Sequence, residues 1–299
     1  MERYQSQVYK SAEAEKLLKA LYEKHLSEIT APYSEQYVDT RFGETHIVKY
    51  GNPDGIPVLG FHGGNSTNPY SLRPFTKYAD LSKICFIVPD TIGNIGLSCD
   101  HRLSSRTLDY GKWVNDICDE LCYDRIAVFA GSYGAGIALR FAAFSPERIT
   151  KMMLMVPSGI ANASPINMLK IGLPTIAYMR QPGDMKKLAH AVRSLMPFYD
   201  DEFLEMTDAA LQHTKFEMTM PRNTKHKEMK KLSAPVYVIA EKYDLLFPGE
   251  RVLARAKRLF PNLVGTMLLE TGGHGSFLHD GGKRPDFFDT INAFYIQYV

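Results

Sequence analysis

Cysteine is scarce in this chain of 299 residues, and neither sign of charge is in strong excess. The four cysteines, Cys85, Cys99, Cys118 and Cys122, are too few for a disulfide scaffold and lack the spacing of a metal site. Lys and Arg number 35 against 33 Asp and Glu, which leaves a net charge of only +2. This balance argues against nucleic acid, or an anionic membrane surface, as the main partner.

Long apolar runs are absent as well. The most apolar stretch without charge, residues 152–169, is interrupted by prolines, serines and asparagines, so we expect no membrane span. The first 18 residues are polar and charged and lack the apolar centre of a secretory leader. We therefore expect a cytoplasmic protein with reduced thiols, in which Cys118 and Cys122 are buried on a helix as small apolar side chains.

What the chain does contain is an alternation of short apolar segments and amphipathic ones. Its 45% hydrophobic and 23% charged residues are typical of a globular protein with one large domain, or a domain with an insert. Residues 38–51 predict an antiparallel hairpin around Gly43. Further buried strands are predicted at 57–61, 84–88, 125–130, 152–156, 236–240 and 266–269, and helices at 11–28, 110–121, 134–144 and 287–295. Continuous apolar strands separated by helices indicate a mostly parallel sheet covered on both faces.

One long stretch, residues 158–231, has no convincing strand but contains helical fragments, broken by Pro165, Pro174, Pro182 and Pro197. We predict that it forms a helical cap inserted after the sixth strand. The core is then made of residues 1–157 and 232–299, with residues 1–30 as an N-terminal helical extension. Six apolar residues of the cap are expected to pack over the open end of the sheet and line a pocket: Met168, Leu169, Ile171, Leu173, Ile176 and Met179.

The strongest sign of chemistry is the segment Ala130-Gly131-Ser132-Tyr133-Gly134, which lies between an apolar strand and a helix. Small residues two positions before and after a serine are typical of the nucleophile elbow, a tight turn that lifts the hydroxyl above the sheet at a helix N-terminus. A turn in which Ser132 merely caps the helix is the alternative. The strand before the serine and the helix after it favour a nucleophile.

A serine nucleophile needs a base, and the base needs an orienting acid. His274, within Thr-Gly-Gly-His-Gly, is the first histidine after the last strand and is the predicted base, with His279 as a second candidate. The acid is expected in the loop after strand 236–240, because the chain order is serine, acid, histidine. Asp244 is the first choice and Glu241 the rival. Taken singly, each of these groups could instead be an exposed turn or surface residue.

The HGGN motif at 62–65 directly follows the strand at 57–61. Backbone N–H groups held near a reacting carbonyl stabilise the oxyanion that forms during acyl transfer, and Gly64 and Tyr133 are the expected pair of donors. A plain loop is the alternative for this motif. Asp90 ends another strand, and we expect it to hold a structural turn together with Ser98 rather than to act as the acid.

From about Tyr37 to the C-terminus, the chain resembles the α/β-hydrolase superfamily. The resemblance rests on motifs in a fixed order: HGGN, the PDxxGxxGxS run at 89–98, the serine elbow, the late Asp and the late His. The hairpin, the N-terminal helix and the length are similar to those of bacterial carboxylesterases. The resemblance implies an α/β-hydrolase fold, with a mostly parallel eight-stranded sheet flanked by helices and a helical cap. It also implies a triad of Ser132, Asp244 and His274, with no metal and no cofactor. Ala130, in place of the first elbow glycine, and Glu241, where a small residue is common, depart from the family pattern.

The predicted function is that of a serine hydrolase, which cleaves carboxylic esters of small apolar substrates through an acyl-enzyme intermediate. The alternative enzyme is a prolyl-iminopeptidase-like aminopeptidase, in which Glu202, Glu205 and Asp208 bind a free amine. A solvated helix face is the simpler interpretation of these three carboxylates. A ligand-binding receptor that retains the same residues on the same fold is a third, less favoured hypothesis.

Overall fold

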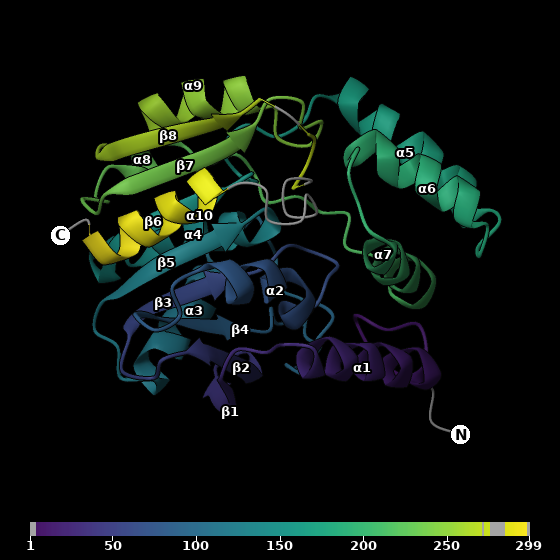
Figure 1. Cartoon of the computed structure of the whole chain (residues 1–299), viewed down its shortest axis with the longest axis horizontal. Helices are drawn as coiled ribbons and strands as arrows, with labels where there is room; N and C mark the ends of the chain where they lie inside the picture. Colours follow the sequence, from purple (N-terminus) through teal and green to yellow (C-terminus); the bar gives the residue numbers. More distant parts are fainter. Residues whose placement is uncertain (1–3, 271, 276–284, 298–299) are drawn as a thin grey trace.

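A single sheet of eight strands runs through the computed structural model, which describes residues 4–270, 272–275 and 285–297. The strands are β1 (Tyr33–Thr40), β2 (Gly43–Gly51), β3 (Ile56–Phe61), β4 (Ile84–Pro89), β5 (Ile126–Gly131), β6 (Ile149–Met155), β7 (Val236–Glu241) and β8 (Leu263–Leu269). Their spatial order is β1-β2-β4-β3-β5-β6-β7-β8. β2 pairs antiparallel with both β1 and β4, and the other pairs are parallel. The predicted mostly parallel eight-stranded sheet is confirmed (Figure 1).

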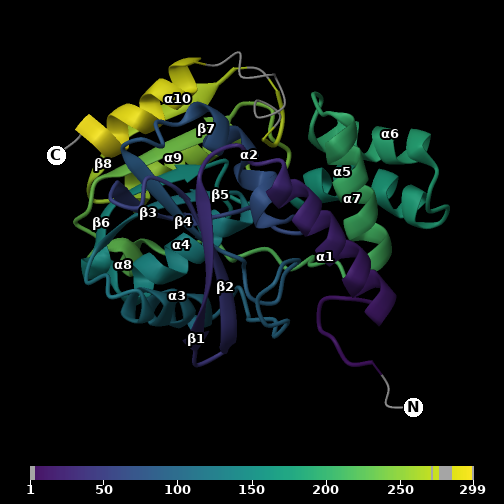
Figure 2. The same cartoon turned by 60° about the horizontal axis from the view of Figure 1, so that its bottom comes forward.

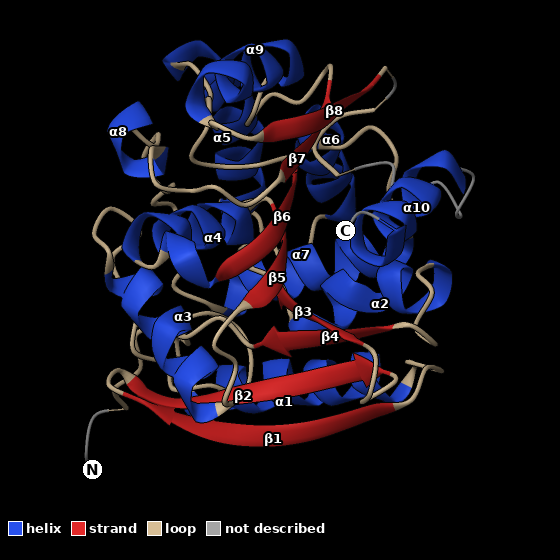
Figure 3. Ribbon diagram, turned by 90° about the vertical axis from the view of Figure 1, so that its left-hand side faces the viewer, coloured by secondary structure: helices blue, strands red, loops and turns tan. Residues whose placement is uncertain are grey.

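Helices cover both faces of this sheet, with α3 and α4 on one side and α2 and α10 on the other (Figure 3). Val128 of β5 belongs to the same core as Trp113 of α3, whereas the next residue, Phe129, packs on Phe75 of α2. Successive side chains of a strand point to opposite faces, so both faces are apolar. The helices of the core are α1 (Ala12–Ser27), α2 (Asn68–Tyr78), α3 (Asp109–Glu120), α4 (Tyr133–Phe144), α9 (Gly249–Leu259) and α10 (Pro285–Asn292), with a 3₁₀ turn η1 (Pro146–Arg148) and a π-helical turn η3 (Ala293–Gln297).

Four helices lie between β6 and β7, the stretch for which a cap is predicted: α5 (Pro165–Met179), α6 (Met185–Leu195), α7 (Asp201–His213) and α8 (His226–Met229). Figure 1 shows α5, α6 and α7 beside one end of the sheet. The break expected at Pro174 is wrong, because α5 continues through this residue. A proline removes a single helical hydrogen bond, here the one to the Lys170 carbonyl, and the other bonds of this 15-residue helix carry it past Pro174.

The expectation that all six apolar residues of α5 pack inward is also wrong. Met168 and Ile171 pack, half-buried, against the core. Leu169, Leu173, Ile176 and Met179 are exposed. With 3.6 residues per turn, these residues lie on different sides of the helix, and only one side of α5 meets the core.

The cysteines are free thiols in unequal surroundings. Cys85 and Cys118 are buried, as expected for small apolar side chains, but Cys122 is exposed. The expectation for Cys122 fails because α3 ends at Glu120, and Cys122 follows in a left-handed backbone conformation (φ 58°) that turns the chain toward β5. No described helix is both long and apolar enough to cross a bilayer.

Candidate active site

A sharp turn between β5 and α4 presents Ser132 at the carboxyl edge of the sheet. Ser132 has φ 51° and ψ −119°, a conformation that favours glycine. Its N–H donates to the Met155 carbonyl of β6 (2.9 Å), and its carbonyl accepts from the N–H of Ser158 (3.1 Å). Gly134 permits the close approach, because a Cβ there would lie 2.4 Å from the Phe61 carbonyl oxygen. The backbone of β3 and β6 therefore holds the serine in its strained position.

Three of the side chains predicted to act together lie in a hydrogen-bonded row. Ser132 Oγ is 2.8 Å from His274 Nε2, and His274 Nδ1 is 2.8 Å from Asp244 Oδ2. Asp244 is buried, and its other carboxylate oxygen accepts the N–H groups of Leu246 (2.7 Å) and Phe247 (3.0 Å). These bonds fix the carboxylate, which in turn orients the imidazole. The second histidine candidate, His279, lies outside the described residues.

Glu241, the rival acid, is fully buried and contacts the backbone of the histidine loop. Its Oε2 accepts the N–H of Gly275 (2.6 Å), the residue after His274. The N–H of His274 itself donates to the Leu195 carbonyl at the end of α6 (3.0 Å). Two bonds from different elements thus hold the loop that carries His274. The sequence showed a carboxylate at position 241, but it gave no sign that the Gly275 N–H is its partner.

The electrostatic surroundings of His274 favour its charged form. Burial acts to lower the pKa of His274, but the adjacent Asp244 carboxylate and the nearby Glu241 carboxylate outweigh it. The net result is a pKa above the ordinary value of 6.5. The imidazole is therefore a stronger base than a free histidine.

Gly63 and Gly64 of the HGGN loop lie against the turn that carries Ser132 and Tyr133. A Cβ on Gly64 would lie 3.1 Å from the Tyr133 Cβ, and one on Gly63 would lie 3.8 Å from the Ser132 Cβ. The HGGN loop is thus packed directly on the elbow. Within the part of the chain that the structure describes, neither the Gly64 nor the Tyr133 N–H makes a hydrogen bond.

His62 and Asn65 hold the HGGN loop in place, and the sequence alone did not identify either role. His62 is buried, with Nδ1 2.8 Å from the Gly63 carbonyl, and its Nε2 accepts the Thr91 N–H (3.2 Å). Burial lowers the pKa of His62, which favours the neutral ring that can accept the Thr91 N–H. The Asn65 side chain bonds the backbone of Glu217 in both directions, which links the loop to the segment after α7.

Asp90 is a structural residue, as predicted. One of its oxygens accepts the N–H of Leu97 (2.8 Å), and its carbonyl accepts the Ser98 hydroxyl (2.8 Å). The same carboxylate lies against His46 and Tyr22, at 3.1 Å from each, so it also ties the hairpin and α1 to the sheet.

The three carboxylates of α7 are engaged with neighbouring side chains. Glu202 pairs with Arg73 of α2, Glu205 pairs with Lys24 of α1 (2.7 Å), and Asp208 accepts from Tyr178 and Gln212. Only Glu205 is exposed. A fully solvated face is therefore wrong for Glu202 and Asp208, because α7 packs on the core and on α5. Each carboxylate already has a partner, although Glu202 Oε1 accepts no hydrogen bond from a described residue.

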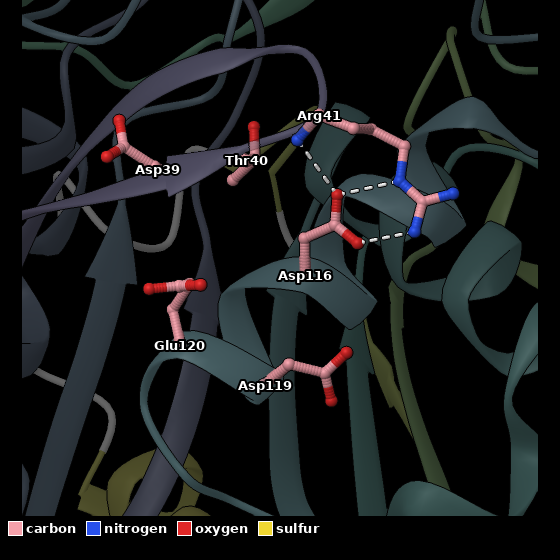
Figure 4. Close-up of a pocket in the computed structure, with 6 residues that line it drawn as sticks. All are labelled: Asp39, Thr40, Arg41, Asp116, Asp119 and Glu120. Carbon is pink, nitrogen blue, oxygen red and sulfur yellow. Dashed lines mark hydrogen bonds and ion pairs between the residues drawn. The ribbon is translucent and has the colours of Figure 1, made fainter.

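A surface hollow elsewhere in the molecule is lined by carboxylates from β1 and α3, and it contains none of the residues above (Figure 4). Its lining residues are Asp39, Thr40, Arg41, Asp116, Asp119 and Glu120. Arg41 makes a two-pronged ion pair with Asp116 (2.7 and 2.8 Å). Among the described residues, no group of three or more His, Cys, Asp and Glu is arranged to hold a metal ion.

The fold agrees with what the comparisons with known proteins found. A family model for the alpha/beta hydrolase fold matches residues 56–182. The chain has the α/β-hydrolase fold and resembles bacterial carboxylesterases.

Two Bacillus subtilis carboxylesterases are among the relatives. One, the uncharacterized carboxylesterase nap of strain 168, is 21% identical over 240 residues, which cover 79% of either chain. The crystal structure of the other, carboxylesterase CesB (YbfK), superposes with a TM-score of 0.80 at 19% identity, over 96% of this chain and 100% of that one. A probable proline iminopeptidase of Leptolyngbya boryana is 31% identical over 114 residues, 36% of this chain and 35% of that one.

Proposed function

We propose that this chain is a serine esterase that cleaves carboxylic esters through an acyl-enzyme intermediate. The observation that carries the proposal is the row Ser132–His274–Asp244, with two contacts of 2.8 Å, at the turn between β5 and α4. The similarity to bacterial carboxylesterases over four-fifths of the chain supports the same reaction.

In the proposed mechanism, His274 Nε2 accepts the hydroxyl proton as Ser132 Oγ attacks the ester carbonyl carbon. The carbonyl oxygen becomes an oxyanion, to which the N–H groups of Gly64 and Tyr133 donate. Asp244 accepts the Nδ1 proton of His274 and stabilises the imidazolium. The alcohol then leaves with the proton from His274. Water, activated by the same histidine, releases the acid and regenerates Ser132.

The surroundings of the proposed nucleophile favour apolar acyl or alcohol groups. A Cβ on Gly131 would lie 3.1 Å from the Met155 methyl, and one on Gly275 would lie 3.7 Å from the Met196 methyl. The Phe247 ring meets the His274 ring edge-on, with centroids 5.3 Å apart. Methionine side chains adapt to different shapes, so we infer broad selectivity among small apolar esters.

Aminopeptidase activity remains the second candidate because of the 31% identity to a probable proline iminopeptidase. That identity extends over about a third of the chain. The carboxylates that were candidates for binding the amine pair with Arg73, Lys24 and Tyr178 instead. We therefore favour the esterase.

A substrate panel separates the two activities. Wild-type protein is assayed with p-nitrophenyl esters from acetate to decanoate and, in parallel, with prolyl p-nitroanilide. We expect hydrolysis of the esters, no turnover of the anilide, and a loss of about a thousandfold or more in Ser132→Ala. The Glu202→Gln variant is the control for the alternative, and it should leave the ester rates unchanged. Turnover of the anilide alone would favour the aminopeptidase, and ester hydrolysis retained in Ser132→Ala would refute the proposed nucleophile.

A further inference from the structure

The outer side of α5 carries an exposed apolar stripe. Its members are Ile166 (68% exposed), Leu169 (59%), Leu173 (56%), Ile176 (51%) and Met179 (39%). Their spacing of three or four residues places them in one row along the helix. Met185, at the start of α6, is exposed next along the chain. A run of large apolar side chains left in water on one helix is unusual for a soluble surface and marks an interaction site.

The stripe belongs to the helical hairpin α5–α6, residues 164–197, which stands beside the candidate active site. The Asn167 side chain of α5 donates to the Leu245 carbonyl in the Asp244 loop (3.1 Å). The carbonyl of Leu195, the last residue of α6, accepts the N–H of His274 (3.0 Å). Figures 1 and 2 show both helices projecting away from the sheet. A partner that binds this hairpin would therefore lie next to the loops that carry Asp244 and His274.

Positive charge accompanies the apolar stripe. Residues 164–197 contain five Lys and Arg but a single acidic residue, Asp184, which gives a net charge of +4. The whole chain carries +2, so the remainder carries a net −2. Lys170, Arg180 and Lys186 are exposed and form no ion pair with any described residue. Lys170 lies one turn from Ile166, and Arg180 lies one turn from Ile176, so these cations border the stripe.

We propose that the α5–α6 hairpin docks on anionic phospholipid surfaces. The apolar stripe enters the boundary between headgroups and acyl chains, and Lys170, Arg180 and Lys186 meet the phosphates of anionic lipids. The total charge of +2 argued against an anionic membrane surface as a partner. That total hides the concentration of positive charge on the hairpin. Docking sets the loops that carry Asp244 and His274 next to the lipid. The inference rests on the surface and is independent of the proposed esterase activity.

The charge of the hairpin favours lipid over a second copy of the chain. A symmetric dimer would place the same patch of both molecules face to face. Two hairpins of +4 would then oppose each other, and like charges across an interface weaken association. An anionic surface turns the same charges into attraction.

Vesicle sedimentation tests the proposal. The Ser132→Ala protein, which removes any dependence on catalysis, is mixed with vesicles of phosphatidylcholine containing 30% phosphatidylglycerol, or with pure phosphatidylcholine. We expect binding to the anionic vesicles that weakens at high salt, and little binding to the neutral ones. Adding Leu169→Ser with Ile176→Ser, or Lys170→Gln with Arg180→Gln and Lys186→Gln, should weaken binding by about tenfold or more.

Two control variants remove the same kinds of side chain, lysine and leucine, from surfaces outside the hairpin. The variant Lys227→Gln with Lys230→Gln and Lys231→Gln loses the same charge from exposed lysines near α8, and Leu17→Ser loses an exposed leucine of α1. Both should bind anionic vesicles like the parent. The proposal is overturned if the parent stays in the supernatant, if the hairpin variants bind as well as the controls, or if ultracentrifugation shows a dimer that the Leu169→Ser, Ile176→Ser variant abolishes.

Discussion

Ser132 has a backbone conformation that is unfavourable for every residue with a side chain. We propose that the chain tolerates this strain because the turn positions the hydroxyl for reaction. A residue forced into such a region costs about 1–3 kcal/mol, part of which a glycine recovers despite its greater freedom in the unfolded chain. We expect Ser132→Gly to exceed Ser132→Ala in free energy of unfolding by about 1 kcal/mol. Urea denaturation of the two variants measures the difference. Equal stabilities, or a more stable alanine variant, would mean that the elbow is not strained.

Two buried carboxylates near His274 should have unequal effects on catalysis. Asp244 contacts the imidazole, so Asp244→Asn should lower kcat by about 10⁴-fold. Glu241 contacts the Gly275 N–H, which a glutamine oxygen can still accept, so Glu241→Gln should lower kcat less than about tenfold. Steady-state kinetics with one ester compares the two variants. A larger loss in Glu241→Gln would make Glu241 the acid.

The dependence of activity on pH should report the protonation of His274 and the effect of the Glu241 charge on it. His274 must be neutral to accept the proton, so activity should rise with pH through a pKa above 6.5. Glu241 raises the pKa of His274 through its charge, and removing that charge should move the rising limb of the Glu241→Gln profile to lower pH. An unshifted limb would mean that the Glu241 charge does not reach the imidazole.

At this scale the sequence left one choice open for a physical reason. The elbow could be predicted because small residues at fixed offsets from Ser132 reflect a local turn. Glu241 ends β7, and Asp244 lies only three residues later in the loop that follows. Which of them meets His274 depends on the path of two loops that are distant in the chain, and neither path is encoded by local spacing.

The junction of β3 with α4 tolerates no side chain at Gly134. A Cβ there would lie 2.4 Å from the Phe61 carbonyl oxygen, whereas a Cβ on Gly172 of α5 would meet nothing within 4 Å. Gly134→Ala should therefore lower the free energy of unfolding by about 3 kcal/mol or more, and Gly172→Ala should raise it by up to about 1 kcal/mol. Thermal and urea unfolding of both variants test this. Similar effects of the two substitutions would contradict the close contact.

The elements that the sequence revealed are those whose burial follows a regular pattern. The inner strands, such as β4 and β5, were predictable because they are apolar on both faces, and the hairpin of β1 and β2 was predictable from the turn at Gly43. Two helices were missed: α2 carries Pro69 and Pro74, and α9 has only a narrow apolar stripe among charged residues. The exposed side of α5 could not be foreseen, because apolar periodicity shows that a face exists but not whether another element covers it.

At the whole-molecule scale, a buried polar network around His46 links α1, the β1–β2 hairpin and the rest of the sheet. His46 Nδ1 lies 3.1 Å from Asp90 Oδ2, its Nε2 lies 3.1 Å from Glu35 of β1, and the Tyr22 hydroxyl of α1 reaches Asp90. Burial acts to lower the pKa of His46, but the Asp90 and Glu35 carboxylates outweigh it, so the net shift is upward. The network therefore joins α1 and the hairpin to the sheet, and its two carboxylates favour the charged form of His46.

This network makes stability depend on pH. The pKa of His46 is higher in the folded than in the unfolded chain, so its contribution is complete below about pH 6.5 and is lost as pH rises through the folded pKa. The difference in free energy of unfolding between wild type and His46→Gln should be largest near pH 6 and should shrink toward pH 9. Urea denaturation at several pH values measures it. A difference that stays constant or grows with pH would contradict a charged His46.

The central claim, that Ser132 is an activated nucleophile, is tested most directly by covalent labelling. A fluorophosphonate probe reacts with such a serine, forming an oxygen–phosphorus bond and releasing fluoride, and intact-mass and peptide mass spectrometry locate the adduct. We predict one adduct per chain, on Ser132 in the wild type, much slower labelling in His274→Ala and none in Ser132→Ala. A wild type that gains no adduct would match a binding protein without catalysis, and an adduct that persists in Ser132→Ala would contradict the account.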